Sequence, residues 1–273
     1  MIQKNHINIF NQRLFNFWIS VYYGLLSLSI SNCFFWIYQQ IHLPLNSSLF
    51  IFSSIAAYYY YQKEIAPVYF HQLNKNLTKL QLTTILFLAI LSLYFFIRLN
   101  FEIQATVACF FIVGIAYHNH TKFFIFRKLL VWKNIVISIC WTGICLMSFN
   151  LNHLGQLNLW LIAMGFFILV FIQSVLFDFI DIDKDKQYGH QTLALALIPD
   201  KLFQLTQNLG LLLAFILLSV TFLGKLSIFG FLLNICLLSV YYSKFFLFIK
   251  SHHPHLIYFT DIIFLLFSAG FLI

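Results

Sequence analysis

An acidic segment of eight residues, Asp178 to Asp185, holds four of the eight acidic residues of the chain. On a helix that turns by about 100° per residue, Asp178, Asp181 and Asp185 fall within about 60° of one another, whereas Asp183 points about 140° away. Three carboxylates on one face repel one another and are costly to desolvate, so a cation is expected beside them. Mg2+ prefers oxygen ligands and often bridges carboxylates to substrate phosphates. The segment therefore predicts a Mg2+ site for a phosphorylated ligand, with Asp178, Asp181 and Asp185 as catalytic and metal-binding residues.

Two other interpretations apply to this segment. Three of its aspartates match positions 1, 3 and 5 of an EF-hand calcium loop, but Lys186 stands where the turn glycine belongs and Thr192 where the bidentate Glu belongs, which excludes that site. The segment could also be a solvated loop in which Lys184 and Lys186 neutralise two carboxylates. The metal site is favoured because the acids begin within the last turn of an apolar helix, where an Asp at the bilayer centre costs roughly 2.5–3.5 kcal/mol.

The elements that carry these residues belong in a membrane. The chain is 61% hydrophobic and only 9% charged, with a mean hydropathy of +0.86, whereas soluble domains are about 25% charged. A spanning helix needs about 20 apolar residues. The sequence therefore predicts an all-α integral membrane protein, a nine-transmembrane-helix bundle that forms one domain over residues 1–273. The predicted spans are 16–38, 45–62, 81–98, 101–117, 129–149, 156–179, 202–223, 226–243 and 256–273.

The 16 Lys and Arg residues predict the orientation of these spans. With the N-terminus in the cytoplasm, Arg98 and Lys225 fall outside and the other 14 fall inside, as the positive-inside rule requires. An odd number of spans then puts the C-terminus outside and the acidic segment on the cytoplasmic side. We therefore expect a multi-pass protein of a bacterial cell membrane. No nucleic-acid partner is expected, because the net charge of +8 comes from residues scattered over short loops.

The aspartates and the residues after them form the pattern Asp178-x-x-Asp181-x-x-x-Asp185-x-x-x-Gly189-x-x-Thr192. This pattern resembles the second aspartate-rich motif of the UbiA-type intramembrane prenyltransferases. The resemblance extends to the architecture, because those proteins have nine transmembrane helices and carry this motif after the sixth. It implies a helical bundle around a central cavity, where Mg2+ binds a polyprenyl diphosphate and a prenyl group passes to a lipophilic acceptor.

The first aspartate motif of that family is missing from this chain. Residues 57–67, at the end of the second span, contain Glu64 as their only acid. We expect Glu64 to help the second motif hold one metal ion, or Lys63 to supply positive charge directly to the substrate. The run of four tyrosines before them includes Tyr59, whose ring could stabilise an allylic cation. An interfacial aromatic belt is the alternative explanation for these tyrosines.

Basic residues in the loop between the fourth and fifth spans are further substrate-binding candidates. The resemblance implies that Lys122, Arg127 and Lys128 contact the diphosphate, which suits the geometry of Arg and Lys with phosphate oxygens. The positive-inside rule alone would also place basic residues here. Asp261, near the start of the last span, joins the candidates because an intramembrane carboxylate is a functional candidate by default.

Two classes of function follow from these residues. The first is an integral-membrane prenyltransferase-like enzyme, whose partners are a polyprenyl diphosphate, a lipophilic acceptor and membrane lipid. The second is a non-catalytic isoprenoid- or lipid-binding protein, or a scaffold, with the same fold, and the missing first motif supports it. A transporter is disfavoured, because the predicted spans carry few polar groups that could lie at the bilayer midplane.

Overall fold

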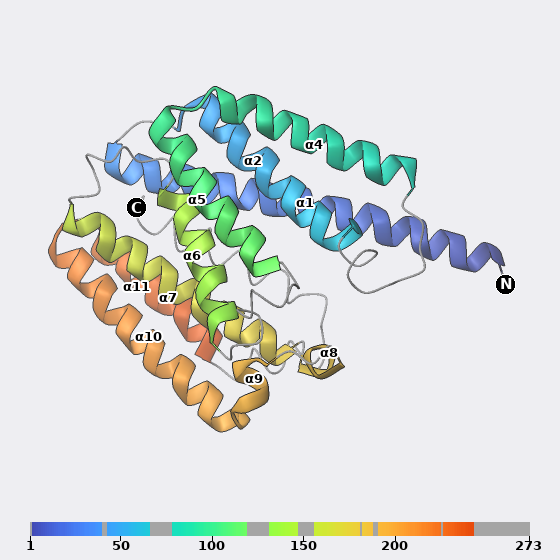
Figure 1. Ribbon diagram of the computed structural model, residues 1–273. Coiled ribbons are helices and arrows are strands. Elements are labelled where there is room, and N and C mark those ends of the chain that lie inside the picture. Colours follow the sequence, from blue (N-terminus) through green and yellow to red (C-terminus); the bar gives the residue numbers. More distant parts are fainter. Residues whose placement is uncertain are drawn as a thin grey trace.

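The part of the chain that the structure describes is entirely helical. The structure is a computed structural model that describes residues 2–39, 43–65, 78–118, 131–146, 156–180, 182–187, 191–224 and 226–242. Within these ranges it contains helices and no strand (Figure 1). The all-α prediction is therefore confirmed.

The long helices follow the predicted spans closely. They are α1 (Ile2–Gln39), α2 (Leu45–Tyr60), α4 (Lys79–Ile97), α5 (Phe101–His118), α6 (Trp132–Leu146), α7 (Leu157–Ile180), α10 (Pro199–Phe222) and α11 (Ile228–Tyr242). A π-helix, η1 (Tyr61–Ile65), continues α2, and two short helices, α8 (Ile182–Gln187) and α9 (Leu193–Ala196), follow α7. The last predicted span, 256–273, lies outside the described residues, so the count of nine stays a prediction.

Four of the described helices are long and apolar enough to cross a membrane on their own. They are Leu14–Phe35 within α1, α4, Leu157–Phe179 within α7, and α10. Their burial differs widely: 72% of the α7 span is buried inside the protein, whereas only 6% of the α4 span is. Helix α7 is thus a central element of the bundle, and α4 exposes its apolar side chains at the periphery.

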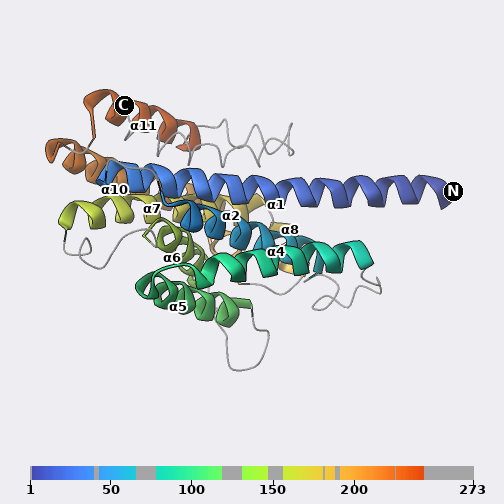
Figure 2. The ribbon, with the colours of Figure 1, turned by 90° about the horizontal axis from the view of Figure 1, so that it is seen from above.

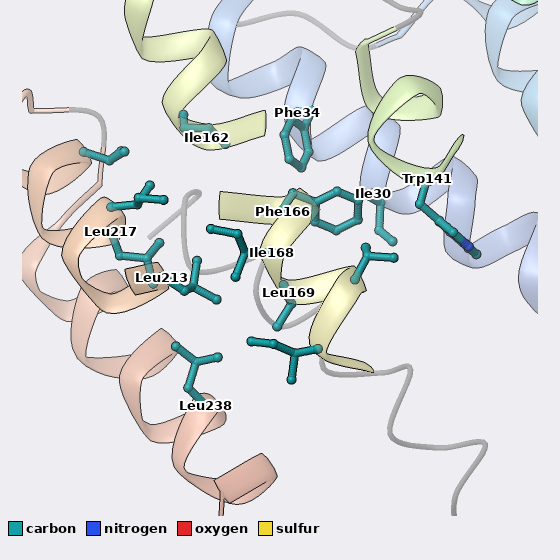
Figure 3. Packing of buried hydrophobic residues seen from close by; sticks show 14 of the residues in the cluster. Ile30, Phe34, Trp141, Ile162, Phe166, Ile168, Leu169, Leu213, Leu217 and Leu238 are labelled. Carbon is teal, nitrogen blue, oxygen red and sulfur yellow. The ribbon is translucent and has the colours of Figure 1, made fainter. Parts of the chain in front are cut away.

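The main hydrophobic core surrounds α7. Leu169 of α7 is fully buried, and Phe166, one turn earlier, meets Phe34 of α1 with the ring centroids 5.4 Å apart (Figure 3). Leu213 of α10 and Trp141 of α6 belong to the same cluster. The core therefore joins helices from both halves of the chain.

The helices pack side by side in chain-neighbour pairs and across the bundle. Helix α1 contacts α2 and α6, α2 contacts α4, and α7 contacts α6 and α10. Figure 2 shows α1, α2 and α4 running alongside one another. The short helices α8 and α9 contact the C-terminal end of α7, and α9 also contacts α10 (Figure 1). This end of the bundle carries the acidic segment.

Two helix starts are built from local sequence signals. Thr78 caps α4 in a capping box: its hydroxyl accepts from the Gln81 backbone N–H, and the Gln81 side chain accepts from the Thr78 backbone N–H at 2.9 Å. Pro199 opens α10, where its missing N–H costs nothing. Gly224 has a φ of +69° in the turn between α10 and α11, a conformation that glycine adopts without strain.

Candidate functional site

The centre of the candidate site is an ion pair between α6 and α7. The Lys133 ammonium lies 2.5 Å from Oδ1 of Asp178 and 3.6 Å from Oδ2 of Asp185. Both aspartates are buried, with 3% and 6% of their surface exposed, and the Lys133 side chain is 16% exposed. One ammonium thus bridges two buried carboxylates, one at the end of α7 and one in α8.

The second oxygen of Asp178 has a partner of its own. The Asn134 amide donates to Oδ2 of Asp178 at 2.9 Å and to the Ser174 hydroxyl at 2.8 Å. Asn134 is fully buried, so its amide is withdrawn from water and these bonds matter more than they would at a surface. Asp178 therefore accepts from two adjacent residues of α6, one charged and one neutral.

Lys133 lies at an unfavourable position in its helix, and its ion pairs with Asp178 and Asp185 must offset this cost. Lys133 is the second residue of α6, the end where the helix macrodipole disfavours a cation. The two carboxylates reverse that preference, because a buried carboxylate is stable only when it is paired. The same dipole favours the negative charge of Asp178 opposite the start of α6.

Glu64 is held by a separate set of side chains. Its Oε1 accepts from the Asn16 amide of α1 at 2.6 Å, and its Oε2 accepts from the Gln81 amide of α4. Gln81 is the residue that completes the capping box of α4. Glu64 is 7% exposed, so this buried carboxylate links η1 to α1 and α4.

The other two candidates near Glu64 differ in their surroundings. Tyr59 stacks on Tyr23 of α1 with ring centroids 4.0 Å apart and an interplanar angle of 9°. The Trp141 ring of α6 also packs against Tyr23, with ring centroids 6.4 Å apart, and Trp141 belongs to the main core. Tyr59 therefore packs into the bundle rather than forming only an interfacial belt, while Lys63 is exposed.

Several predicted site residues lie outside the described residues. They are Asp181, Lys122, Arg127, Lys128 and Asp261. Their assignments stay predictions. Among the described candidates, the structure brings Asp178 and Asp185 together through Lys133, and it gives Glu64 partners from other helices.

Solved structures with a similar fold cover almost the whole chain. A UbiA homolog from Aeropyrum pernix K1, in its apo form, is 12% identical over 92% of this chain and 98% of its own, with a TM-score of 0.65. A UbiA homolog from Archaeoglobus fulgidus bound to GPP and Mg2+ is 15% identical over 94% and 98%, with a TM-score of 0.62. A digeranylgeranylglyceryl phosphate synthase is 16% identical over the same shares, with a TM-score of 0.60. The chain has the UbiA fold. No family model and no curated protein matches the sequence.

The UbiA fold and the apolar helices together make this an integral, multi-pass membrane protein. The orientation of its termini stays a prediction.

Asp178 and Glu64 do not fit a Mg2+ ion with the partners that they have in this structure. Mg2+ requires near-octahedral oxygen ligands at about 2.0–2.1 Å. Asp178 instead has an ammonium on one oxygen and an amide on the other, and both oxygens of Glu64 accept from amides. In the described part of the chain, no three His, Cys, Asp or Glu side chains gather as metal ligands.

Asn134 and Ser174 are not among the site residues that the sequence predicts. Lys133 stands just inside the helix that follows the loop with Lys122, Arg127 and Lys128, where the sequence indicates a topology signal or a diphosphate contact but no contact with an aspartate. A usable signal was present for Asn134, since an amide inside an apolar helix needs a polar partner when it is buried. Its partners, however, lie about forty residues away in the chain, and sequence spacing on one helix does not reveal them.

Proposed function

We propose that this protein binds a polyprenyl diphosphate at the cytoplasmic end of its helical bundle and transfers the prenyl group to a lipophilic acceptor. The observation that carries the proposal is the Lys133 ammonium bridging Asp178 and Asp185. These aspartates are the ones whose spacing resembles the second UbiA motif. The UbiA homolog from Archaeoglobus fulgidus, which has the same fold, is bound to GPP and Mg2+.

The chemistry that this site supports is heterolysis of an allylic C–O bond. The diphosphate leaves with the bonding electron pair, and the allylic cation that remains is captured by the acceptor, which then loses a proton. Preorganised positive charge near the departing oxygens lowers the barrier to this step. We propose that Lys122, Arg127 and Lys128 supply this charge, while Lys133, whose charge is shared with two carboxylates, adds a hydrogen-bond donor.

Asp178 and Asp185 act here as positioning residues. They hold the Lys133 ammonium at the buried end of α7, and Asn134 fixes the carboxylate of Asp178 in turn. An ammonium has three N–H donors, so it can serve two carboxylates and a phosphate oxygen. Losing the aspartates would leave a flexible lysine without a fixed orientation.

The apolar bundle supplies the second requirement of the reaction. An allylic cation reacts with water, so water must be kept from it until the acceptor attacks. Helix α7 carries several buried apolar residues on the approach to Asp178, among them Ile172, Val175 and Leu176, beside the buried polar residues Gln173 and Ser174. Tyr59 and Tyr23 add π faces that can stabilise a cation.

The test is binding and turnover of geranyl, farnesyl and longer polyprenyl diphosphates by the purified protein in detergent, with Mg2+ and with EDTA. Wild type is compared with an Asp178/Asp181/Asp185→Asn triple variant. We expect wild type to bind at least one donor and the triple variant to lose that binding. The matched control is Asp183→Asn, which removes an exposed aspartate of the same segment and should leave binding unchanged. No binding of any donor by wild type, in either condition, would refute the proposal.

A non-catalytic isoprenoid- or lipid-binding protein is the second candidate. The contacts of Glu64 favour it, because the only acid in the region of the missing first motif is occupied by Asn16 and Gln81. The same assay separates the two functions. Donor binding without release of pyrophosphate, in the presence of a range of aromatic and lipid acceptors, would support the non-catalytic protein.

A further inference from the structure

We infer that the Lys133 ammonium is the resident cation of this site and keeps divalent metal ions off Asp178 and Asp185. The pair of buried carboxylates needs a positive charge between them. In this chain the Lys133 side chain supplies a positive charge at the place where a metal ion would otherwise lie.

The geometry supports this role because a single ammonium serves both acids. It lies 2.5 Å from Asp178 and 3.6 Å from Asp185, which are seven positions apart in the chain and belong to different helices. The contact to Asp178 is a charge-assisted hydrogen bond, a kind roughly twice as strong as a hydrogen bond between neutral groups. A cation in this position neutralises one carboxylate and attracts the other.

The same geometry excludes a divalent ion. A metal bound to Oδ1 of Asp178 would lie close to the ammonium, and like charges at such separations repel strongly in a buried site. The other oxygen of Asp178 accepts from the Asn134 amide, and moving the metal there would displace a buried donor. Both oxygens of the Asp178 carboxylate thus have a partner that opposes metal binding: the Lys133 ammonium at Oδ1 and the Asn134 amide at Oδ2.

The start of α6 is an unfavourable position for a lysine. The first turn of a helix disfavours a cation, and Lys133 directly precedes a fully buried residue of α6. Its interactions with the two aspartates compensate for that unfavourable position. The lysine is therefore part of the acidic site and not only a topology signal.

The experiment is a titration with Mn2+ alone, followed by electron paramagnetic resonance of the purified protein in detergent. Wild type and Lys133→Arg keep the cation, and we expect both to bind Mn2+ at the two aspartates only weakly. Lys133→Gln removes the charge and should bind Mn2+ about a hundredfold more tightly than wild type, since it leaves two buried carboxylates uncompensated. Adding Asp178→Asn to Lys133→Gln should abolish the gain.

The inference is overturned if wild type binds Mn2+ as tightly as Lys133→Gln does. A second variant keeps the test decisive if Lys133→Gln does not fold. Asp185→Asn leaves the contact between Lys133 and Asp178 in place, and we expect its Mn2+ titration to match that of wild type. If Asp185→Asn instead loses Mn2+ that wild type binds, a metal does occupy the pair and the inference is wrong.

These outcomes are independent of the proposed function. Tight Mn2+ binding by wild type at the aspartates would overturn the inference while leaving diphosphate binding intact. Conversely, failure of every prenyl diphosphate to bind would refute the proposed function without changing the expected Mn2+ titrations. If both hold, binding of the donor by wild type should persist in EDTA.

Discussion

Glu64 shows how a buried carboxylate can join helices together. It stands on the π-helix that continues α2, and it accepts from Asn16 of α1 and from Gln81 of α4. Gln81 also closes the capping box at the start of α4. One side chain therefore ties the end of one helix to the beginning of another and to a third helix beside them.

We expect Glu64→Ala to destabilise the protein by about 1–3 kcal/mol, because it leaves the buried Gln81 amide without its acceptor. The measurement is the thermal unfolding midpoint in detergent. Glu102→Ala is the matched control, since Glu102 is an exposed acid in the first turn of α5. An unchanged midpoint together with an altered Mg2+ requirement would show instead that Glu64 is a metal ligand.

The sequence identified the acids of the site better than their partners. Asp178 and Asp185 could be selected because their spacing on a helix and their position after an apolar segment are visible in the chain. Lys133 and Asn134 reach Asp178 across 45 and 44 positions, and only the packing of α6 against α7 defines that contact. The role of Glu64 as a link between helices depends on three helices at once, which no local pattern encodes.

Among the elements, α1 and α2 come close together at Gly24. A Cβ atom added there would lie 2.9 Å from Cδ2 of Phe52 and 3.0 Å from the Phe52 carbonyl oxygen. The ring could turn away, but the carbonyl belongs to the backbone of α2. Gly24 thus sets how near the two helices can come, in the way small residues do at membrane helix interfaces.

Gly24→Ala is therefore expected to destabilise the protein by about 1–3 kcal/mol through overpacking. Gly165→Ala, in α7, is the comparison, because its added Cβ would meet only side-chain atoms, 3.3 Å from Leu213 and 3.6 Å from Ile216. Unfolding midpoints of both variants check this. Equal midpoints for the two would contradict the proposed backbone clash.

The hydropathy of the sequence predicted where the described long helices lie, but it did not predict all of their ends. The predicted span 202–223 and the helix α10 differ by a few residues, because an apolar segment and its helix share most of their length. Helix α1 begins at Ile2, well before the predicted span at 16. The polar start of the chain is helical as well, and a hydropathy criterion detects only the part that suits lipid.

At the scale of the whole molecule, the bundle is organised from a buried centre to a lipid-exposed edge. Helix α7 contacts α6, α8, α9 and α10 and carries much of the main core. Helix α4 exposes large apolar residues such as Leu86, Phe87 and Ile90. In a membrane such a surface faces lipid tails, which are as apolar as the side chains themselves.

The orientation of the bundle gives a further prediction. We expect a green fluorescent protein fused to the N-terminus to fluoresce, because the positive-inside rule puts that end in the cytoplasm. An alkaline phosphatase fused to the C-terminus should be active, since nine spans put that end outside. A truncated control that ends in the turn at Gly224, after the seventh predicted span, should also give active phosphatase. Inactivity of the full-length fusion, with an active truncated one, would show that the last spans are miscounted.

The polar residues of α1 bear on how this helix is inserted into the membrane during synthesis. Its span, Leu14–Phe35, is the least apolar of the four described helices that could cross a membrane alone. Asn16 finds its acceptor on η1, and Asn32 accepts from the backbone N–H of Leu43, before α2. The partners of the first helix are thus synthesised after it. We therefore expect α1 to leave the translocon slowly and to settle in the bilayer together with α2, as a helical hairpin.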